Sequence, residues 1–524
     1  MIPESAHRKI YVTGLILLSL GILFSGPVAS MSTMLIGVNW ISEKRYRERL
    51  RSFLSNKTAL LLSSVFLLHL IGLAWTSDFQ YALNDIKTKI PLIVLPFFIS
   101  TTSPLSKKEF HLLMAFFTAG TVFYTLISMS VLAGWLPIEV NDIRDISPFI
   151  SHIRLSLMIC LSIFALVFFL KEYTSVILRM IFSISIIWLI IFMGILESLT
   201  GLSILIIVTI LIGAVYFSRH RPRIAILFGL FVLTIFVLSS LQVYSVAKGF
   251  LNVKPVQVSL LPKKTVQGNP LYNDTLFPIV ENGTYVMLQI CWEELSAGWE
   301  KKSKIPFDTP DSEGNRASIT LIRYMASKGM LRKDAESFAT LSPADIHAIE
   351  NGVTNYKYQS LSSLNSRIYE SIWEIDVYRK GSNPSGHSMT MRFEFWKTGW
   401  HIFRNNWVTG VGTGDVKQAF MKQYRADRSQ LTERWQLRGH NQYLAIAVAF
   451  GLPGLLLFLL SLIYPLRTNR RFLNYWYVVF WLIICISMLT EDTLETQAGV
   501  NFYAFFNSIF IFAQPRVSLP PAQD

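Results

Sequence analysis

The stretch from Met180 to Phe217 reads MIFSISIIWLIIFMGILESLTGLSILIIVTILIGAVYF and decides the fold class of this chain. It holds one charged side chain, Glu197, between two apolar runs at residues 180–196 and 200–217. Each run is close to the roughly 20 residues that an α-helix needs to cross the hydrocarbon core of a bilayer. The stretch therefore predicts two membrane-spanning helices joined by a short loop.

The same apolar pattern recurs along most of the chain. Of its 524 residues, 52% are hydrophobic and only 16% are charged, with a mean hydropathy of +0.40, whereas soluble domains are roughly a quarter charged. Arg8 and Lys9 followed by an apolar run resemble a signal peptide, but we interpret this run as an uncleaved first span because many spans follow. Ten further spans are predicted at 10–25, 27–42, 58–75, 89–104, 109–135, 150–170, 223–244, 440–464, 474–490 and 498–514. The pattern predicts an all-α polytopic membrane protein with about twelve transmembrane helices.

The orientation of these spans follows from the short loops between them. One set of alternate connections holds 19 Lys and Arg residues, and the other set holds only four, Lys87, Lys89, Arg144 and Arg154. Because basic loops stay in the cytoplasm, both termini are predicted to be cytoplasmic. The same placement explains the net charge of +14 without a nucleic-acid partner.

One long polar segment interrupts the spans. We divide the chain into an N-terminal membrane domain at 1–244 with about nine helices, an insert at 245–439, and a C-terminal membrane domain at 440–524 with about three helices. The alternation places the insert outside the cytoplasm. Its composition predicts a mainly helical fold, with a short strand at 283–290 and helices at 315–329, 332–339, 343–351, 361–379 and 388–405. The three cysteines are too few and too scattered for a disulfide framework or a zinc site.

The insert re-enters the membrane at Arg438-Gly-His440-Asn441-Gln-Tyr-Leu444. An imidazole at the mouth of a span is partly desolvated yet open to solvent, which suits a proton acceptor near neutral pH. The alternative is that His440 only caps the helix. A second charged residue at a span mouth is Arg154, which either has a functional role or extends to the lipid headgroups.

A second stretch begins near Arg392 and runs through Trp396 to Gly410-Val-Gly-Thr-Gly-Asp415. The glycine run lacks a preceding strand and a Lys-Ser or Lys-Thr pair, so we favour a sharp turn leaving a helix over a phosphate loop. Arg392 is either an ordinary surface residue of an amphipathic helix or a group that binds an anion.

Taken together and in this order, the motifs resemble the O-antigen ligase family. They are Arg392-x3-Trp396, the glycine run, His440-Asn441-x-Tyr-Leu and Gly451-x2-Gly454, all within about residues 386–460. The resemblance implies a C-type glycosyltransferase-like fold, a multi-pass location in the bacterial inner membrane and a periplasmic insert. It implies an enzyme that takes a glycan from an undecaprenyl-diphosphate carrier to an acceptor hydroxyl, on lipid A-core or another glycolipid, without a metal or other cofactor.

The resemblance also assigns roles to residues. It implies His440 as the catalytic base and Arg392 as an essential cation, with Arg438, Arg154 and Asn441 as further substrate-binding candidates. A guanidinium is a fork of donors suited to phosphate oxygens, so arginines could hold the diphosphate in place of a metal. Many members of the family have a Ser-Arg pair in the loop after the seventh span, but here that loop reads Glu197-Ser-Leu-Thr-Gly201 and has no basic residue.

Three other functions stay open. O-antigen polymerases and protein O-oligosaccharyltransferases of the same superfamily would need nearly the same chemistry. A membrane transporter would be expected to show ionisable residues in mid-span and paired halves, which the sequence lacks. A noncatalytic scaffold for envelope assembly would fit the topology but gives no reason for a His beside several arginines at the membrane surface.

Overall fold

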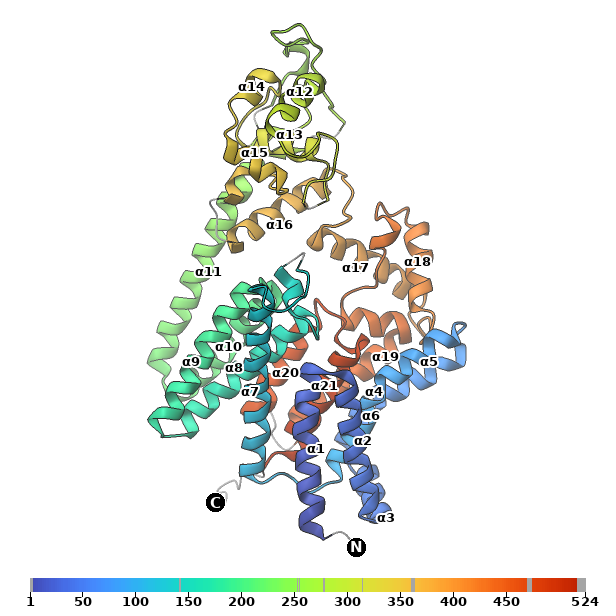
Figure 1. Cartoon of the computed structure of the whole chain (residues 1–524). Coiled ribbons are helices and arrows are strands. Elements are labelled where there is room, and N and C mark those ends of the chain that lie inside the picture. The colour runs from blue at the N-terminus through green and yellow to red at the C-terminus, as the bar shows by residue number, and fades with distance from the viewer. Residues whose placement is uncertain are drawn as a thin grey trace. The chain divides into compact units, whose positions relative to one another are not determined.

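The chain forms two compact units in the computed structural model, which describes residues 3–140, 143–251, 253, 255–276, 279–312, 314–359, 363–468 and 474–515 (Figure 1). The membrane unit comprises Met1–Pro222, Glu394–Ser429 and Gln436–Asp524. The insert unit comprises Arg223–Phe393 and Gln430–Trp435. These units are defined by contacts, and the division into domains at 1–244, 245–439 and 440–524 stays a prediction.

Helices make up nearly all of the membrane unit. They are α1 (Glu4–Phe24), α2 (Gly26–Ser42), α3 (Tyr46–Ser55), α4 (Lys57–Ile71), α5 (Phe79–Lys89), α6 (Pro91–Ser100), α7 (Lys107–Leu132), α8 (His152–Glu172), α9 (Val176–Ile195), α10 (Leu199–His220), the greater part of α17 (Ser388–Asn405), α18 (Val416–Ala426), α19 (Gln442–Arg467), α20 (Tyr475–Ser487) and α21 (Gln497–Ser508), which a π-helical turn extends through Ile509–Ala513.

Eight described helices are long and apolar enough to cross a membrane. They are α1, α4 with the following 3-10 turn (Gly72–Trp75), α7, α8, α9, α10, α11 (Pro222–Leu251) and α19. Each coincides with a predicted span to within a few residues at its ends. The other four predicted spans lie on the shorter helices α2, α6, α20 and α21. The structure is thus that of an all-α membrane protein, and the number of twelve spans stays a prediction.

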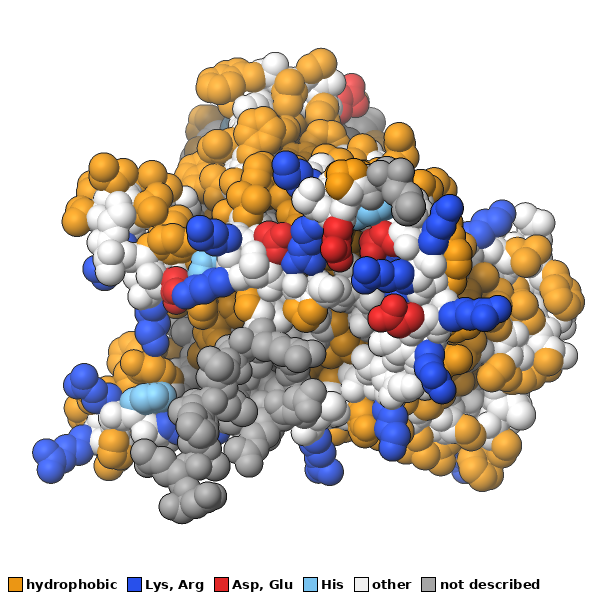
Figure 2. Space-filling view, turned by 90° about the horizontal axis from the view of Figure 1, so that it is seen from below, with side chains coloured by type: hydrophobic (Ala, Val, Ile, Leu, Met, Phe, Trp, Pro, Cys, Tyr) orange, Lys and Arg blue, Asp and Glu red, His pale blue; other side chains and the backbone are white. Residues whose placement is uncertain are grey.

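Basic side chains gather at the end of the membrane unit that carries the N-terminus, and Figure 2 shows this face. Arg8 donates to both carboxylate oxygens of Glu109 and to the carbonyl of Ser103, which joins the start of α1 to the start of α7. Lys107 pairs with Glu172 at the end of α8. Three of the 19 basic residues counted above, Arg470, Arg471 and Arg516, lie outside the described residues. The cytoplasmic assignment of this face stays a prediction.

Helix α19 is broken at Gly451, where φ is +66° and ψ is −165°. Backbone from the glycine run replaces the interrupted helical bonds, because Val411 N–H donates to Val448 C=O (3.0 Å) and Gly412 N–H donates to Ala449 C=O (2.9 Å). Unpaired backbone groups are costly in a bilayer, so a broken span needs such replacement partners. The break therefore depends on the segment that enters from α17.

The insert unit consists of α11 and a helical subdomain. Its helices are α12 (Trp292–Lys302), α13 (Ala317–Ser327), α14 (Ala335–Ala339), α15 (Pro343–Glu350), α16 (Ser363–Arg379) and the start of α17. The core of the subdomain is apolar and includes Ile290, Leu295, Trp299, Leu321, Phe338 and Ile349. A smaller cluster joins α16 to Val246 of α11 through Tyr369, Trp373 and Val377. The predicted insert helices therefore exist.

The predicted strand at 283–290 is wrong in extent. Only Thr284–Tyr285 (β2) is strand, paired antiparallel with Val280–Glu281 (β1). The turn between them is Asn282-Gly283, and both residues have positive φ values of 48° and 87°. An Asn-Gly pair of this conformation makes a tight two-residue hairpin. Beyond Tyr285 the chain turns to deliver Val286, Leu288 and Ile290 to the core.

Candidate functional site

His440 lies immediately before α19, at the end of the membrane unit opposite the N-terminus. Its backbone is left-handed, with φ of +42°, a conformation that histidine adopts more readily than most residues. Asn441 then caps the helix, because its Oδ1 accepts from Leu444 N–H (2.9 Å) while its Nδ2 donates to Leu489 C=O (2.9 Å). Asn441 therefore has a structural function, and its predicted contact with substrate stays a prediction.

The loop between α20 and α21 is held against the start of α19. Buried Gln442 accepts from Leu494 N–H (2.7 Å), and its own N–H donates to Met488 C=O (2.9 Å). This loop carries three carboxylates that the sequence analysis did not single out, Glu491, Asp492 and Glu495. Glu491 and Asp492 are buried and Glu495 is half-buried, and the three surround the motif that contains His440.

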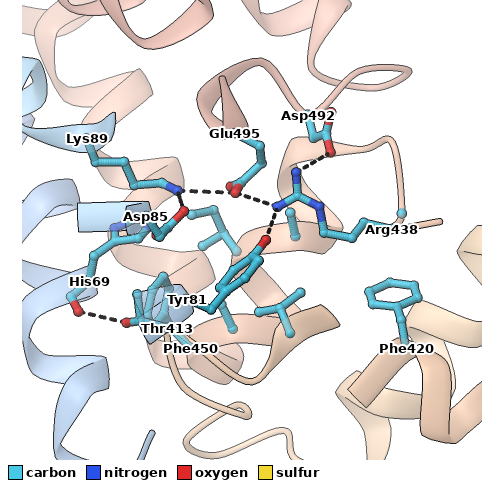
Figure 3. A pocket seen from close by; sticks show the side chains of 15 residues that line it. His69, Tyr81, Asp85, Lys89, Thr413, Phe420, Arg438, Phe450, Asp492 and Glu495 are labelled. Atoms are coloured by element: carbon cyan, nitrogen blue, oxygen red, sulfur yellow. Dashed lines mark hydrogen bonds and ion pairs between the residues drawn. The ribbon is translucent and has the colours of Figure 1, made fainter. Parts of the chain in front are cut away.

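The carboxylate of Glu495 is the hub of a buried charge network (Figure 3). One of its oxygens accepts from Lys89 Nζ (3.2 Å) and from an Nη atom of Arg438 (2.8 Å). Lys89 also pairs with Asp85, and Arg438 also lies 3.6 Å from Asp492. We name these five residues the charge network. It links α5, the segment before α19 and the loop before α21.

The charge network lines a small pocket together with His69 and Tyr81 (Figure 3). Arg438 donates to the Tyr81 hydroxyl (3.3 Å), and His69 Nε2 lies 3.9 Å from Asp85. The Nδ1 atom of His69 donates to the carbonyl of Val65 (2.8 Å), since a carbonyl can only accept. Polar groups therefore converge where the end of α4 meets the start of α19.

The pKa values of the network's carboxylates are shifted in opposite directions. Burial, together with the charge of Glu495, raises the pKa of Asp85 to about 6 although Lys89 opposes the shift. Burial likewise raises the pKa of Asp492, against the effect of the His440 and Arg438 charges. For Glu495, burial is outweighed by Lys89 and Arg438, which hold its pKa below the ordinary value. Glu495 is therefore the fixed negative charge around which the others are arranged.

His440 faces a carboxylate and an aromatic ring. Its Nδ1 atom lies 3.9 Å from Oδ1 of Asp492, and its ring lies 5.5 Å from that of Phe395 in α17. A carboxylate so placed stabilises the imidazolium that forms when the ring takes a proton. His440, Glu491 and Asp492 also offer ligand atoms within 4.8 Å of one another and could hold a metal ion. The predicted independence from metal therefore stays a prediction.

Arg154 lies close enough to Asp492 for its charge to lower the pKa of that carboxyl. One Nη atom of Arg154 donates to Ser151 Oγ (2.8 Å), and its Nε is buried with no hydrogen-bond partner among the described residues. A donor without an acceptor is expected where a ligand supplies one. The structure therefore brings Arg154, Arg438 and His440 to the same end of the membrane unit.

Arg392 belongs to the insert unit. It lies in the first turns of α17, where an Nη atom donates to the carbonyl of Ser388 (3.4 Å). The same helix continues into the membrane unit at Glu394. The role of Arg392 toward a diphosphate stays a prediction.

The glycine run is a tight turn between α17 and α18, as the sequence indicates. A Cβ atom on Gly410 would lie 2.3 Å from the backbone of Ala449, and one on Gly414 would lie 2.2 Å from the carbonyl of Asp78. Asp415 accepts from the backbone N–H groups of Ser77 and Asp78 (2.8 and 2.9 Å). The glycines are thus required for close backbone packing against α19 and the start of α5. This packing accounts for the glycine run without a phosphate loop.

Residues 352–459 match the family model described as O-antigen ligase. The matched range is about a fifth of the chain and contains Arg392, the glycine run, His440 and the break in α19. No curated protein sequence matches the chain.

Proposed function

We propose that this chain, which the match over residues 352–459 assigns to the O-antigen ligase family, moves a glycan from an undecaprenyl-diphosphate carrier to a hydroxyl group of lipid A-core. The family is one of membrane glycosyltransferase-type enzymes, and the helices of the chain fit a membrane environment. The observation that carries the finer proposal is that His440, which lies within the matched range, is beside the carboxylate of Asp492. The proposed location is the bacterial inner membrane, with both termini in the cytoplasm and the insert in the periplasm.

The chemistry requires a base, because the acceptor hydroxyl must lose its proton as it attacks the anomeric carbon. His440 takes this proton in our proposal, and Asp492 stabilises the resulting imidazolium. The bond between the sugar and the diphosphate then breaks, and the carrier diphosphate leaves with the bonding electrons. A diphosphate is already a good leaving group, so the site has only to hold its charge.

Arginines hold that charge in our proposal. The buried Nε of Arg154 has no hydrogen-bond partner among the residues that the structure describes, and so it retains hydrogen-bonding capacity for a phosphate oxygen. Arg438 already pairs with Glu495 and Asp492, so its main contribution is to fix the backbone next to His440, with a smaller one to the diphosphate. Arg392 is the third cation that we assign to the donor, on the basis of the family motif.

The direct test uses a strain that depends on this protein for its surface glycolipids. His440→Asn keeps a residue that tolerates the left-handed backbone but removes the base, and we expect O-antigen to be missing from the lipid A-core. His347→Asn is the matched control, because this histidine in the insert unit is 75% exposed, and we expect it to have no effect. Normal attachment of O-antigen in the His440→Asn strain would refute the proposed role.

The same experiment separates ligase from polymerase. If the protein is a ligase, loss of activity leaves long glycans that are not attached to the core. If it is an O-antigen polymerase, single repeats appear on the core and long chains are absent. Unchanged glycolipids on deletion of the whole gene would instead point to a protein acceptor or to transport.

A further inference from the structure

The C-terminal half of α17 and the turn that follows it expose large apolar side chains. Trp400 and Trp407 are each 56% exposed, and Val408 is 52% exposed. Trp400 lies in α17, and Trp407 and Val408 lie in the turn just after its last residue, Asn405. We name Trp400, Trp407 and Val408 the tryptophan surface. Large apolar side chains exposed together indicate that this surface contacts a partner that is itself partly apolar.

The tryptophan surface is continuous with an exposed apolar stripe of α19. Leu452 N–H donates to the carbonyl of Trp407 (2.7 Å), and a Cβ atom on Gly451 would lie 2.6 Å from the carbonyl oxygens of Trp407 and Val408. From this contact, exposed aliphatic side chains continue down the helix at helical spacing, at Leu452, Leu456, Leu460 and Ile463. The stripe belongs to a helix that is long and apolar enough to span a membrane. Whatever covers the stripe therefore also reaches Trp407 and Val408.

Basic side chains lie beside the tryptophan surface. Lys397 and Arg404 are exposed on α17 within one turn of Trp400, whereas Phe395, Thr398 and Ile402 on its other side are buried. Tryptophan together with Lys and Arg is the combination found at the boundary between lipid and water, where indole rings lie at headgroup level and cations meet lipid phosphates.

We propose that the tryptophan surface inserts into the lipid–water interface of the bilayer that α19 spans. The segment 394–412 is then a half-embedded element and not a loop in water. Gly451 lies nine residues after Gln442, or roughly 14 Å along the helix axis at 1.5 Å per residue. Trp407 and Val408 thus lie deeper than the start of α19, and His440 is held near headgroup level. This inference rests on the membrane unit alone and does not depend on the transfer of a glycan.

The test measures depth with spin labels in the full-length protein reconstituted into phosphatidylglycerol-containing vesicles. Labels are placed at Val408→Cys, at Leu456→Cys as the lipid reference, and at Val266→Cys, a residue of the insert unit that is 82% exposed, as the water reference. Unmodified protein gives the background signal, which is expected from partly exposed Cys485, since Cys160 and Cys291 are buried. For each label, collisions with oxygen are compared with collisions with a water-soluble nickel chelate.

We expect the ratio of oxygen to nickel collisions at position 408 to be several-fold higher than at 266 and to approach that at 456. A ratio at 408 equal to that at 266 would overturn the proposal. Protection from both probes would also overturn it, because it would mean that another protein surface covers the site. If Val408→Cys does not give monodisperse protein, quenching of tryptophan fluorescence by brominated lipids tests the same depth. We expect brominated lipids to quench the fluorescence of the wild-type protein more than that of Trp400→Phe/Trp407→Phe. Equal quenching of the two proteins would contradict the proposal.

Discussion

Each of the two units contains a buried set of charges, and the two sets are built differently. In the insert unit, Glu281 accepts from Nε and Nη2 of Arg323 (2.9 and 2.7 Å) and from Asn355 (2.8 Å). The ring of Trp373 lies 3.8 Å from the guanidinium carbon and covers it. One cation thus meets one carboxylate.

In the membrane unit, by contrast, the charges form a chain. Glu495 is shared by Lys89 and Arg438, and each of these cations has a second carboxylate, Asp85 or Asp492. Asp492 then leads to His440. The ion pair of the insert unit therefore stabilises only the fold around it. The charge network of the membrane unit instead connects three separate segments to the position of one imidazole.

The largest expected effect comes from removing the shared carboxylate. Glu495→Gln leaves buried Lys89 and half-buried Arg438 short of a partner, so we expect a loss of about 3–5 kcal/mol in stability together with loss of glycan transfer. Glu281→Gln is the matched change in the insert unit. We expect it to cause a similar loss of stability but to leave more glycan transfer per folded molecule than Glu495→Gln does. Thermal unfolding in detergent and transfer per folded protein are the two measurements.

Double variants that replace both members of an ion pair separate the effect on stability from the effect on transfer. Replacing both members of a buried ion pair with apolar residues of similar volume often restores stability. We expect Glu281→Met/Arg323→Met to recover both stability and transfer. Lys89→Met/Glu495→Met is expected to recover part of the stability but not transfer, because Arg438 loses its anchor. Full transfer by the second double variant would show that the chain of charges has no part in positioning His440.

Backbone packing provides the next contrast. Gly410 and Gly268 both have positive φ (+68° and +91°), but a Cβ atom would collide with Ala449 only at Gly410 and would meet nothing within 4 Å at Gly268. Left-handed backbone costs a residue other than glycine about 1–2 kcal/mol, and overpacking adds about 1–3 kcal/mol. We expect Gly410→Ala to lower the unfolding temperature clearly more than Gly268→Ala. Equal shifts would contradict the packing role of the glycine run.

The smallest effect is a difference in pH dependence. The pKa of Asp85 is raised to about 6, so its contribution to stability is full below the ordinary value of 3.8 and is lost as the pH rises through 6. In the insert unit, hydrogen bonds from Lys328 and Tyr324 outweigh burial and lower the pKa of Asp345 to about 2. The stability that Asp345 contributes is therefore present above pH 3.8 and lost as the pH falls through 2.

Hydrogen exchange of the two units separates these contributions. Between pH 7 and pH 5, after correction for the intrinsic rate, we expect protection around α5 to increase and that of α15 to stay constant. Asp85→Asn should remove the increase. Asp345→Asn should weaken α15 at pH 7 by about 2 kcal/mol without affecting α5. The same pH response in both units would contradict the assignment.

Most of the membrane helices could be predicted because lipid imposes length and hydropathy on each span. The amphipathic helices α3, α5, α12 and α18 were missed, since their apolar residues cover only one face and none is long enough to span. The hairpin at Asn282-Gly283 had a signal that was not used, the Asn-Gly pair itself. His440, Arg438 and Arg154 were singled out as candidates because charge at the mouth of a span is unusual.

The partners of these residues could not be found in the same way. Lys89 was counted only as a topological charge, and Glu491, Asp492 and Glu495 were not considered. Three acidic residues within five positions of a short loop between apolar runs were a usable signal, because such charges near a bilayer need partners. Which cation meets which carboxylate depends on contacts between segments about 400 residues apart, and sequence spacing does not give these.

The central claim, that His440 is the base of a glycosyl transfer supported by the charge network, has a direct measurement. Purified protein in vesicles is given an undecaprenyl-diphosphate-linked glycan and a lipid A-core acceptor, with a chelator present, and the glycosylated acceptor is quantified. The account predicts product with the wild-type protein and at least about a hundredfold less with His440→Asn, in line with the loss of a general base. Equal product from the two proteins would contradict it.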